Sequence, residues 1–109
     1  DSTLMGYALN TLMEDVILVE YVDENEDGTA LNRNGIFIPL NADTKAWRIG
    51  KVLLKGTKTE YVEVGSHVMF PNNLGIPIHN IDVDGIGKVK KGLFLNEARI
   101  FGIVKPNAS

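Results

Sequence analysis

Short apolar segments, broken by turn residues, are the sequence feature that most limits the folds open to this chain. Residues 16–22, 47–54 and 67–70 are rich in β-branched and aromatic side chains. Residues 86–95 and 99–104 continue the pattern, and turns with glycine, proline or asparagine separate many of the segments. Segments of this length and composition are typical of strands. Many short strands with such turns indicate an all-β protein, either a small barrel or a sandwich.

Less regular segments complete the expected order of elements. Residues 61–64, 76–78 and 81–84 each predict a further short strand. Only residues 9–13 favour a short helix, and residues 97–99 are expected to form a single helical turn between the last two strands. The chain has no internal repeat, and its 109 residues suit one domain covering residues 1–109.

The net charge of −3 is unevenly distributed. Residues 1–32 hold eight acids and no lysine or arginine, for a charge of −8, whereas residues 33–109 hold six acids and eleven bases, for a charge of +5. Nucleic-acid binding needs clustered cations, so we expect no nucleic-acid partner. The one compact basic run, residues 88–91, is interpreted as a solvated strand edge whose lysines oppose aggregation.

Cysteine is absent, so the chain can form no disulfide and carry no thiolate chemistry. A lack of cysteine suits a reducing compartment. The longest apolar runs are far too short to span a bilayer, and the first residues lack the basic region of a signal peptide. We therefore expect a cytoplasmic protein without a membrane partner.

Residues 23–28 match the first half of a calcium-binding EF-hand loop, with acceptors at Asp23, Asn25 and Asp27. The twelfth position of that loop requires a bidentate carboxylate, and here it is Asn34. An EF-hand also needs a preceding helix, whereas a predicted strand precedes this segment. The pattern therefore indicates a polar loop.

The remaining polar side chains form no catalytic or metal-binding pattern. His67 and His79 are not in a zinc-ligand spacing. Asp82 and Asp84 lie on one face of a predicted strand, but no nucleophile or pocket motif accompanies them. We expect no enzyme activity, no metal and no cofactor bound by this chain.

One long polar segment, residues 23–45, interrupts the strand pattern. It holds a single apolar island, residues 35–40. A compact domain rarely carries so long a loop unless the loop is functional or disordered. The island fits either a short buried strand or an exposed anchor that fills a partner's groove with alternate side chains. Its polar, glycine-bearing flanks favour the exposed anchor.

Five segments together resemble the co-chaperonins of the GroES type. In chain order they are residues 14–19, the island at 35–38 in its polar loop, and residues 50–56, 62–70 and 97–104. The sequence departs from the family pattern at Ser66, where Asp is usual, at Leu74, where an aromatic residue is common, and at Phe37, where an aliphatic residue is usual. The segment between Gly56 and Val62 is short, whereas the bacterial co-chaperonins insert a longer roof hairpin there. A short or missing roof resembles the co-chaperonins encoded by tailed phages.

The resemblance implies an irregular GroES-like β-barrel with a long mobile loop at residues 23–45. It further implies a seven-membered ring that caps a GroEL-type chaperonin in the cytoplasm of a bacterium or a phage-infected host. That partner binds and hydrolyses ATP. The implied chaperonin contacts are Gly35, Ile36, Phe37 and Ile38. The implied subunit contacts are Val16, Ile17, Leu18 and Val19 of one subunit against Ile100, Phe101, Ile103 and Val104 of its neighbour.

Two other functions fit the sequence less well. A small β-barrel that binds single-stranded nucleic acid would need a basic groove with stacked aromatic residues, whereas aromatic residues make up only 7% of this acidic chain. Some dehydrogenases contain a GroES-like barrel, but they add a Rossmann half and often cysteine ligands for zinc. A chain of 109 residues without cysteine has room for neither.

Overall fold

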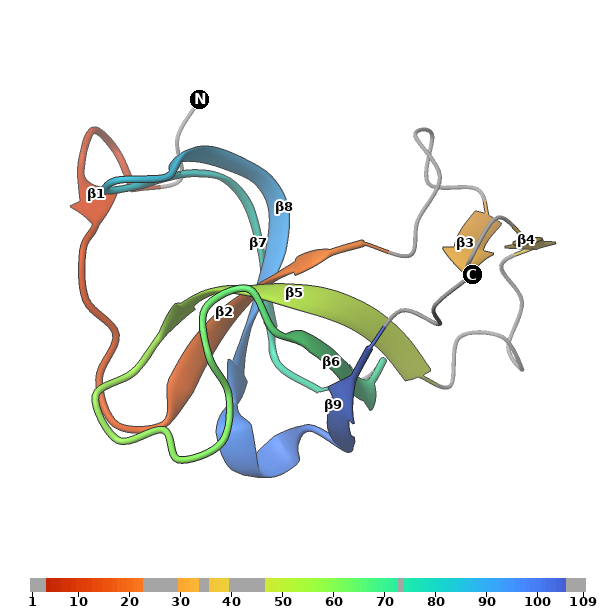
Figure 1. The fold of residues 1–109 in the computed structure, drawn as a ribbon. Helices are drawn as coiled ribbons and strands as arrows, with labels where there is room; N and C mark the ends of the chain where they lie inside the picture. Colours follow the sequence, from red (N-terminus) through yellow and green to blue (C-terminus); the bar gives the residue numbers. More distant parts are fainter. Residues whose placement is uncertain (1–3, 23–29, 34–35, 40–46, 73, 106–109) are drawn as a thin grey trace.

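The computed structural model describes residues 4–22, 30–33, 36–39, 47–72 and 74–105 and confirms the all-β class (Figure 1). The strands are β1 (Ala8–Leu9), β2 (Val16–Tyr21), β3 (Ala30–Arg33), β4 (Ile36–Pro39), β5 (Trp47–Lys55), β6 (His67–Pro71), β7 (Ile76–Val83), β8 (Gly87–Asn96) and β9 (Gly102–Val104). One 3₁₀ turn, η1 (Glu97–Arg99), lies between β8 and β9, as the sequence predicts.

Seven of these strands form one mixed sheet in the order β1-β7-β8-β2-β5-β6-β9. Every neighbouring pair is antiparallel except β1 and β7, which run parallel. Strand β2 lies in the middle, between β5 and β8. Strands β3 and β4 pair with each other in a separate two-stranded sheet.

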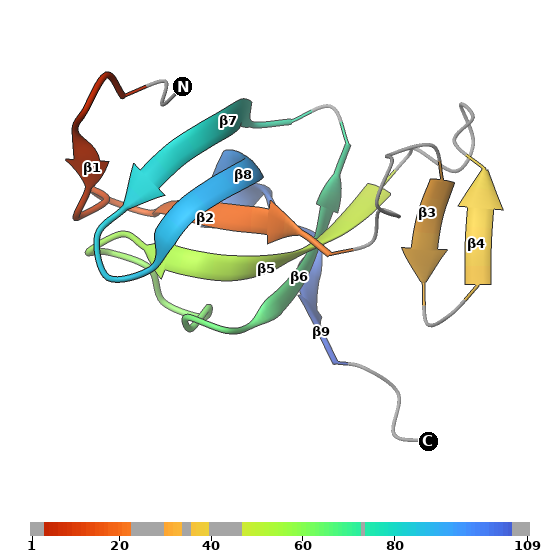
Figure 2. The ribbon, with the colours of Figure 1, turned by 90° about the horizontal axis from the view of Figure 1, so that it is seen from above.

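The expected barrel is not closed by hydrogen bonds. The sheet curls strongly (Figures 1 and 2), but no ladder among the described residues joins its two end strands, β1 and β9. Both end strands are short, with two and three residues. A closed barrel requires pairing between the end strands. The described chain is therefore an open, curled sheet with two short edges.

Burial on both faces explains why residues 16–19 of β2 are apolar without alternation. Ile17 and Val19 face one core, while Leu18 faces a second core on the opposite side of the strand. All three side chains are fully buried. A strand covered on both faces is expected to be a continuous apolar run.

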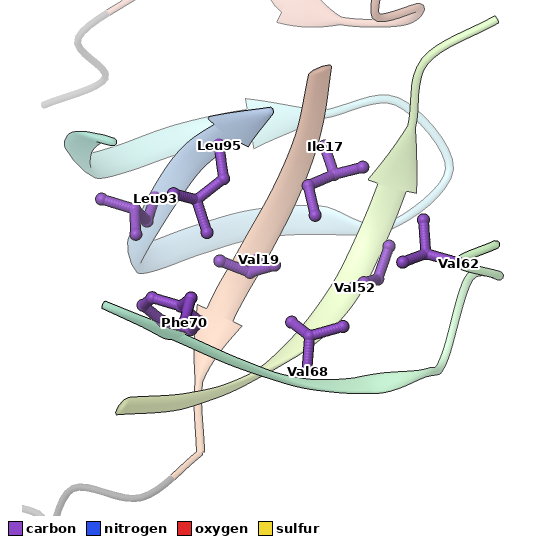
Figure 3. Packing of buried hydrophobic residues seen from close by; sticks show 8 residues of the cluster. All are labelled: Ile17, Val19, Val52, Val62, Val68, Phe70, Leu93 and Leu95. Atoms are coloured by element: carbon purple, nitrogen blue, oxygen red, sulfur yellow. The ribbon is translucent and has the colours of Figure 1, made fainter. Parts of the chain in front are cut away.

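The first core lies inside the curl of the sheet (Figure 3). It combines side chains of β2, β5, β6 and β8 with one residue from a loop, Val62. Its members are Ile17, Val19, Val52, Val62, Val68, Phe70, Leu93 and Leu95. The second core joins the β7–β8 hairpin to β2 and to the N-terminal segment through Leu12, Leu18, Ile81, Val83 and Val89.

The structure corrects two sequence predictions. Residues 9–13 form no helix, because Leu9 lies in β1 and its carbonyl oxygen accepts the backbone N–H of Asp84 at 2.8 Å. Leu12 instead forms an isolated bridge with Gly56. Residues 61–64 form no strand, because the backbone there is held by a side chain described below. In the described part of the chain, no helix is long and apolar enough to cross a bilayer.

Candidate functional site

Residues 36–39 of the apolar island form a strand, which among the described residues does not pair with the seven-stranded sheet. Ile36, Phe37 and Ile38 lie in β4, and β4 pairs only with β3 among the described strands. In that ladder Phe37 lies opposite Asn32, and Ile38 lies opposite Leu31. The rest of the predicted loop, including Gly35, falls outside the described residues, and so do the side chains of β3 and β4.

The N-terminal half of the implied interface lies in the interior of the folded chain. Ile17, Leu18 and Val19 are buried in the two cores, and Val16 is half-buried against the second. Both edges of β2 are already paired, with β5 on one side and β8 on the other. This arrangement leaves β2 no free edge with which to pair a neighbouring subunit.

The C-terminal half of that interface is placed differently. Strand β9 pairs only with β6, so its other edge is unpaired within the described part of the chain. The side chain of Phe101 is 61% exposed and that of Ile103 is 47% exposed. Ile100 packs against the first core, and Val104 is half-buried. These residues therefore combine an open strand edge with exposed apolar side chains.

A groove of about 630 Å³ runs beside β9, and we call it the C-terminal groove. It is lined by residues 100–103 and by Lys58, Glu60 and Tyr61 of the loop after β5. Asp15 and Glu97 also line it. The ring of Tyr61 is 74% exposed. The groove thus presents an aromatic and aliphatic surface with charged residues around it.

Glu97 holds the loop wall of the groove. Its Oε1 accepts the backbone N–H of Glu60 at 2.8 Å, and its Oε2 accepts those of Tyr61 and Val62 at 2.8 and 2.9 Å. Sequence reasoning placed Glu97 in a family-like segment and gave it no role. No local signal could reveal it, because its partners lie 35 to 37 residues away along the chain.

The opposite end of the sheet also has an open edge. Strand β1 pairs only with β7 among the described strands. Just before it, Met5 is 87% exposed and Tyr7 is 78% exposed. Asn10 Nδ2 donates to Asp84 Oδ2 at 2.8 Å and so ties the segment after β1 to the β7–β8 turn. A second exposed apolar edge is therefore held in place far from β9 (Figures 1 and 2).

Ser66, which stands where the co-chaperonin pattern usually has Asp, accepts a hydrogen bond within the turn before β6. The Ser66 hydroxyl oxygen accepts the backbone N–H of Glu63 at 3.1 Å. Gly65 beside it has a φ of +97°, which favours glycine. Its N–H donates to Val52 O, and the N–H of Val52 donates to Ser66 O. The turn before β6 is thus closed with serine as the side-chain acceptor.

The other polar residues singled out in the sequence lie in strands and turns. His67 lies in β6 and His79 in β7. Asp82 lies opposite Lys88 in the β7–β8 ladder. No group of three His, Cys, Asp or Glu side chains able to hold a metal ion occurs among the described residues. The lysines of residues 88–91 are exposed, on a stretch of β8 that pairs with β7 alone.

Two cations flank an aromatic ring at the end of β2. The guanidinium carbon of Arg48 lies 4.4 Å from the centre of the Tyr21 ring, and Lys91 Nζ lies 5.4 Å from it. The ring of Tyr21 also contacts that of Phe70, with 6.0 Å between centroids. These contacts fix the point at which the chain leaves the sheet toward residues 23–45.

Comparison with protein-family models and with curated proteins gave no match for this chain.

Proposed function

We propose that this chain is a co-chaperonin of the GroES type, which assembles into a ring and caps a GroEL-type chaperonin. The observation that carries the proposal is the open sheet with two different exposed edges. Strand β1 follows Met5 and Tyr7, and strand β9 follows Phe101. A contact between two different surfaces is heterologous, and such contacts generate closed rings when the rotation between subunits closes.

This geometry changes the subunit contact that we propose. The resemblance implied that residues 16–19 pair with the neighbour, but β2 has no free edge. The edge on the N-terminal side that remains available is β1. We therefore propose that the Met5–Leu9 segment of one subunit lies against β9 of the next, with Phe101 and Ile103 covered in the contact. A curled open sheet then serves as the GroES-like barrel, with the neighbour covering its open edge.

Chaperonin binding is assigned to the apolar island at Gly35, Ile36, Phe37 and Ile38. The supporting observation is that β4, which contains three of these residues, belongs to a hairpin with no ladder to the seven-stranded sheet. A single displayed segment binds weakly, whereas seven tethered copies raise the effective concentration of the remaining segments once one has bound. Function then resides in multivalent contact, and the ATP chemistry belongs to the chaperonin.

The short segment after β5 supports a lid with a thin roof, as in the phage-encoded members. The chain turns back at Gly56, and the N–H of Lys58 donates to Glu14 O at 2.8 Å. Residues 60–62 are then held by Glu97, and Val62 enters the first core. No hairpin projects from this part of the subunit.

The proposal is tested by mixing the purified chain with a GroEL-type chaperonin and separating the complex by size. Co-elution in the presence of ATP, with loss of co-elution when ATP is omitted, is the expected result. A chain that never co-elutes, or that binds single-stranded oligonucleotides in a salt-dependent manner, would contradict the assignment.

A further inference from the structure

We propose that Glu97 is the positioning residue of the subunit contact: its carboxylate fixes residues 60–62 and so holds Tyr61 beside β9 in the shape that a second copy of this chain requires. The inference rests on the proposed ring and adds to it a specific residue on which assembly depends. It concerns the loop side of the C-terminal groove, whereas the contact itself was assigned above to strand edges.

The carboxylate takes the place of a strand partner for this loop. Three consecutive N–H groups, those of Glu60, Tyr61 and Val62, point at its two oxygens at 2.8 to 2.9 Å. Hydrogen bonds to an ionised acceptor are roughly twice as strong as neutral ones. The loop is fixed at two points, by Glu97 at its backbone and by the buried side chain of Val62 in the first core.

Tyr61 depends on this arrangement because its own side chain is largely exposed. An exposed ring contributes little packing that could hold it in position. Its backbone N–H bond to Glu97 fixes the backbone from which the ring extends, in the groove that Phe101 and Ile103 also line. A preformed groove binds more tightly than one that must be ordered during binding.

Several charged groups face this carboxylate. Asp15 lies just before β2, and Lys58 and Glu60 come from the loop, with Lys58 Nζ 3.2 Å from Glu14 Oε2. Desolvation raises the pKa of Glu97 and so does the charge of Asp15, but the three backbone hydrogen bonds outweigh both and leave the pKa below its usual value. The stabilisation by the Glu97 carboxylate is therefore complete at a pH above the pKa of an ordinary glutamate. It is lost as pH falls through the lower pKa that Glu97 has in the folded chain.

The experiment compares Glu97→Gln with Glu63→Gln, since both remove one charge near the same loop and only the first removes the acceptor of the three N–H groups. Glu63 is exposed and does not line the C-terminal groove. Glutamine has one acceptor oxygen, and its amide nitrogen would face backbone donors. Sedimentation between pH 7 and pH 3 gives the subunit concentration at half assembly, and amide hydrogen exchange reports on residues 60–62.

For Glu97→Gln at pH 7, we expect the subunit concentration at half assembly to rise by about ten-fold or more, because the variant loses hydrogen bonds to a charged acceptor. Exchange at residues 60–62 should be faster, and the acid dependence of assembly should flatten. Glu63→Gln should change none of these. Should Glu97→Gln fail to fold, the wild type decides: its mass must fall in acid before its circular dichroism changes.

Normal assembly of a folded Glu97→Gln variant would overturn the inference while leaving the proposed ring intact. Wild-type assembly that persists in acid until the subunit itself unfolds would overturn it as well. A wild type that is monomeric at every concentration would instead refute the ring and, with it, any role of Glu97 in assembly. Exchange at residues 60–62 would then show only whether Glu97 fixes the loop.

Discussion

Replacing Phe101 with serine is expected to weaken the ring without weakening the subunit. The side chain is 61% exposed, while its backbone N–H donates to Met69 O at 2.7 Å, a bond that serine retains. Full burial of a phenylalanine side chain contributes about 1.5–3 kcal/mol. Scaling by the exposed fraction leaves about 1–2 kcal/mol for each subunit contact. That corresponds to roughly a five- to thirty-fold weaker contact.

The assay is sedimentation velocity over a range of concentrations, with Ile76→Ser as the matched control. Ile76 is 67% exposed in β7 and does not line the C-terminal groove. Every contact of the ring loses the same side chain, so dissociation should move to clearly higher concentration in Phe101→Ser alone. The melting temperature of the dilute subunit should change by less than about 4 °C, as for other surface substitutions. Unchanged assembly of Phe101→Ser would refute the reasoning. A fall in the melting temperature of the dilute subunit by much more than this amount would refute it as well.

Two further predictions concern chaperonin binding by the apolar island and backbone packing at Gly56. The double substitution of Ile36 and Ile38 by serine removes two anchors, each worth about 1.5–3 kcal/mol on burial, from every subunit. Capture by the chaperonin should be lost, while melting and oligomer size stay as in the wild type; a fall of several kcal/mol in unfolding free energy, measured in urea, would identify the island as a core strand. A Cβ at Gly56 would lie 2.2 Å from the carbonyl oxygen of Glu14, so Gly56→Ala should lower stability by about 1–3 kcal/mol or more. Gly102→Ala is its control, because a Cβ there meets no atom within 4 Å; equal melting of the two variants would contradict the account.

Strands buried on both faces were the easiest elements to predict from sequence. Residues 16–19 form an uninterrupted apolar run because Ile17 and Leu18 face different cores. The separate runs at 76–78 and 81–84 were predicted as two strands, but one strand, β7, covers nearly all of both. It continues through Asn80, whose φ of +55° lets the strand change direction without ending.

Elements held by distant side chains could not be predicted. Residues 61–64 alternate like a strand, yet Glu97 accepts the backbone N–H groups of Tyr61 and Val62 across more than thirty residues of sequence. The N–H of Glu63 donates to the hydroxyl oxygen of Ser66. The polar segment that forms β3 carries no strand signal of its own, and it is defined by pairing with the apolar β4. The free edge of a sheet is likewise a property of topology, so the sequence pointed to residues 16–19 as a contact, whereas the fold leaves β1 and β9 open.

The native mass of the free chain tests the central claim most directly. Light scattering or sedimentation at micromolar concentration should give a single closed oligomer, with a mass near seven times the subunit mass of 12.0 kDa. The mass should not grow further with concentration, because a ring has no unpaired end. A 12.0 kDa species across the whole range, or a mass that rises without limit, would contradict the ring and the lid function that depends on it.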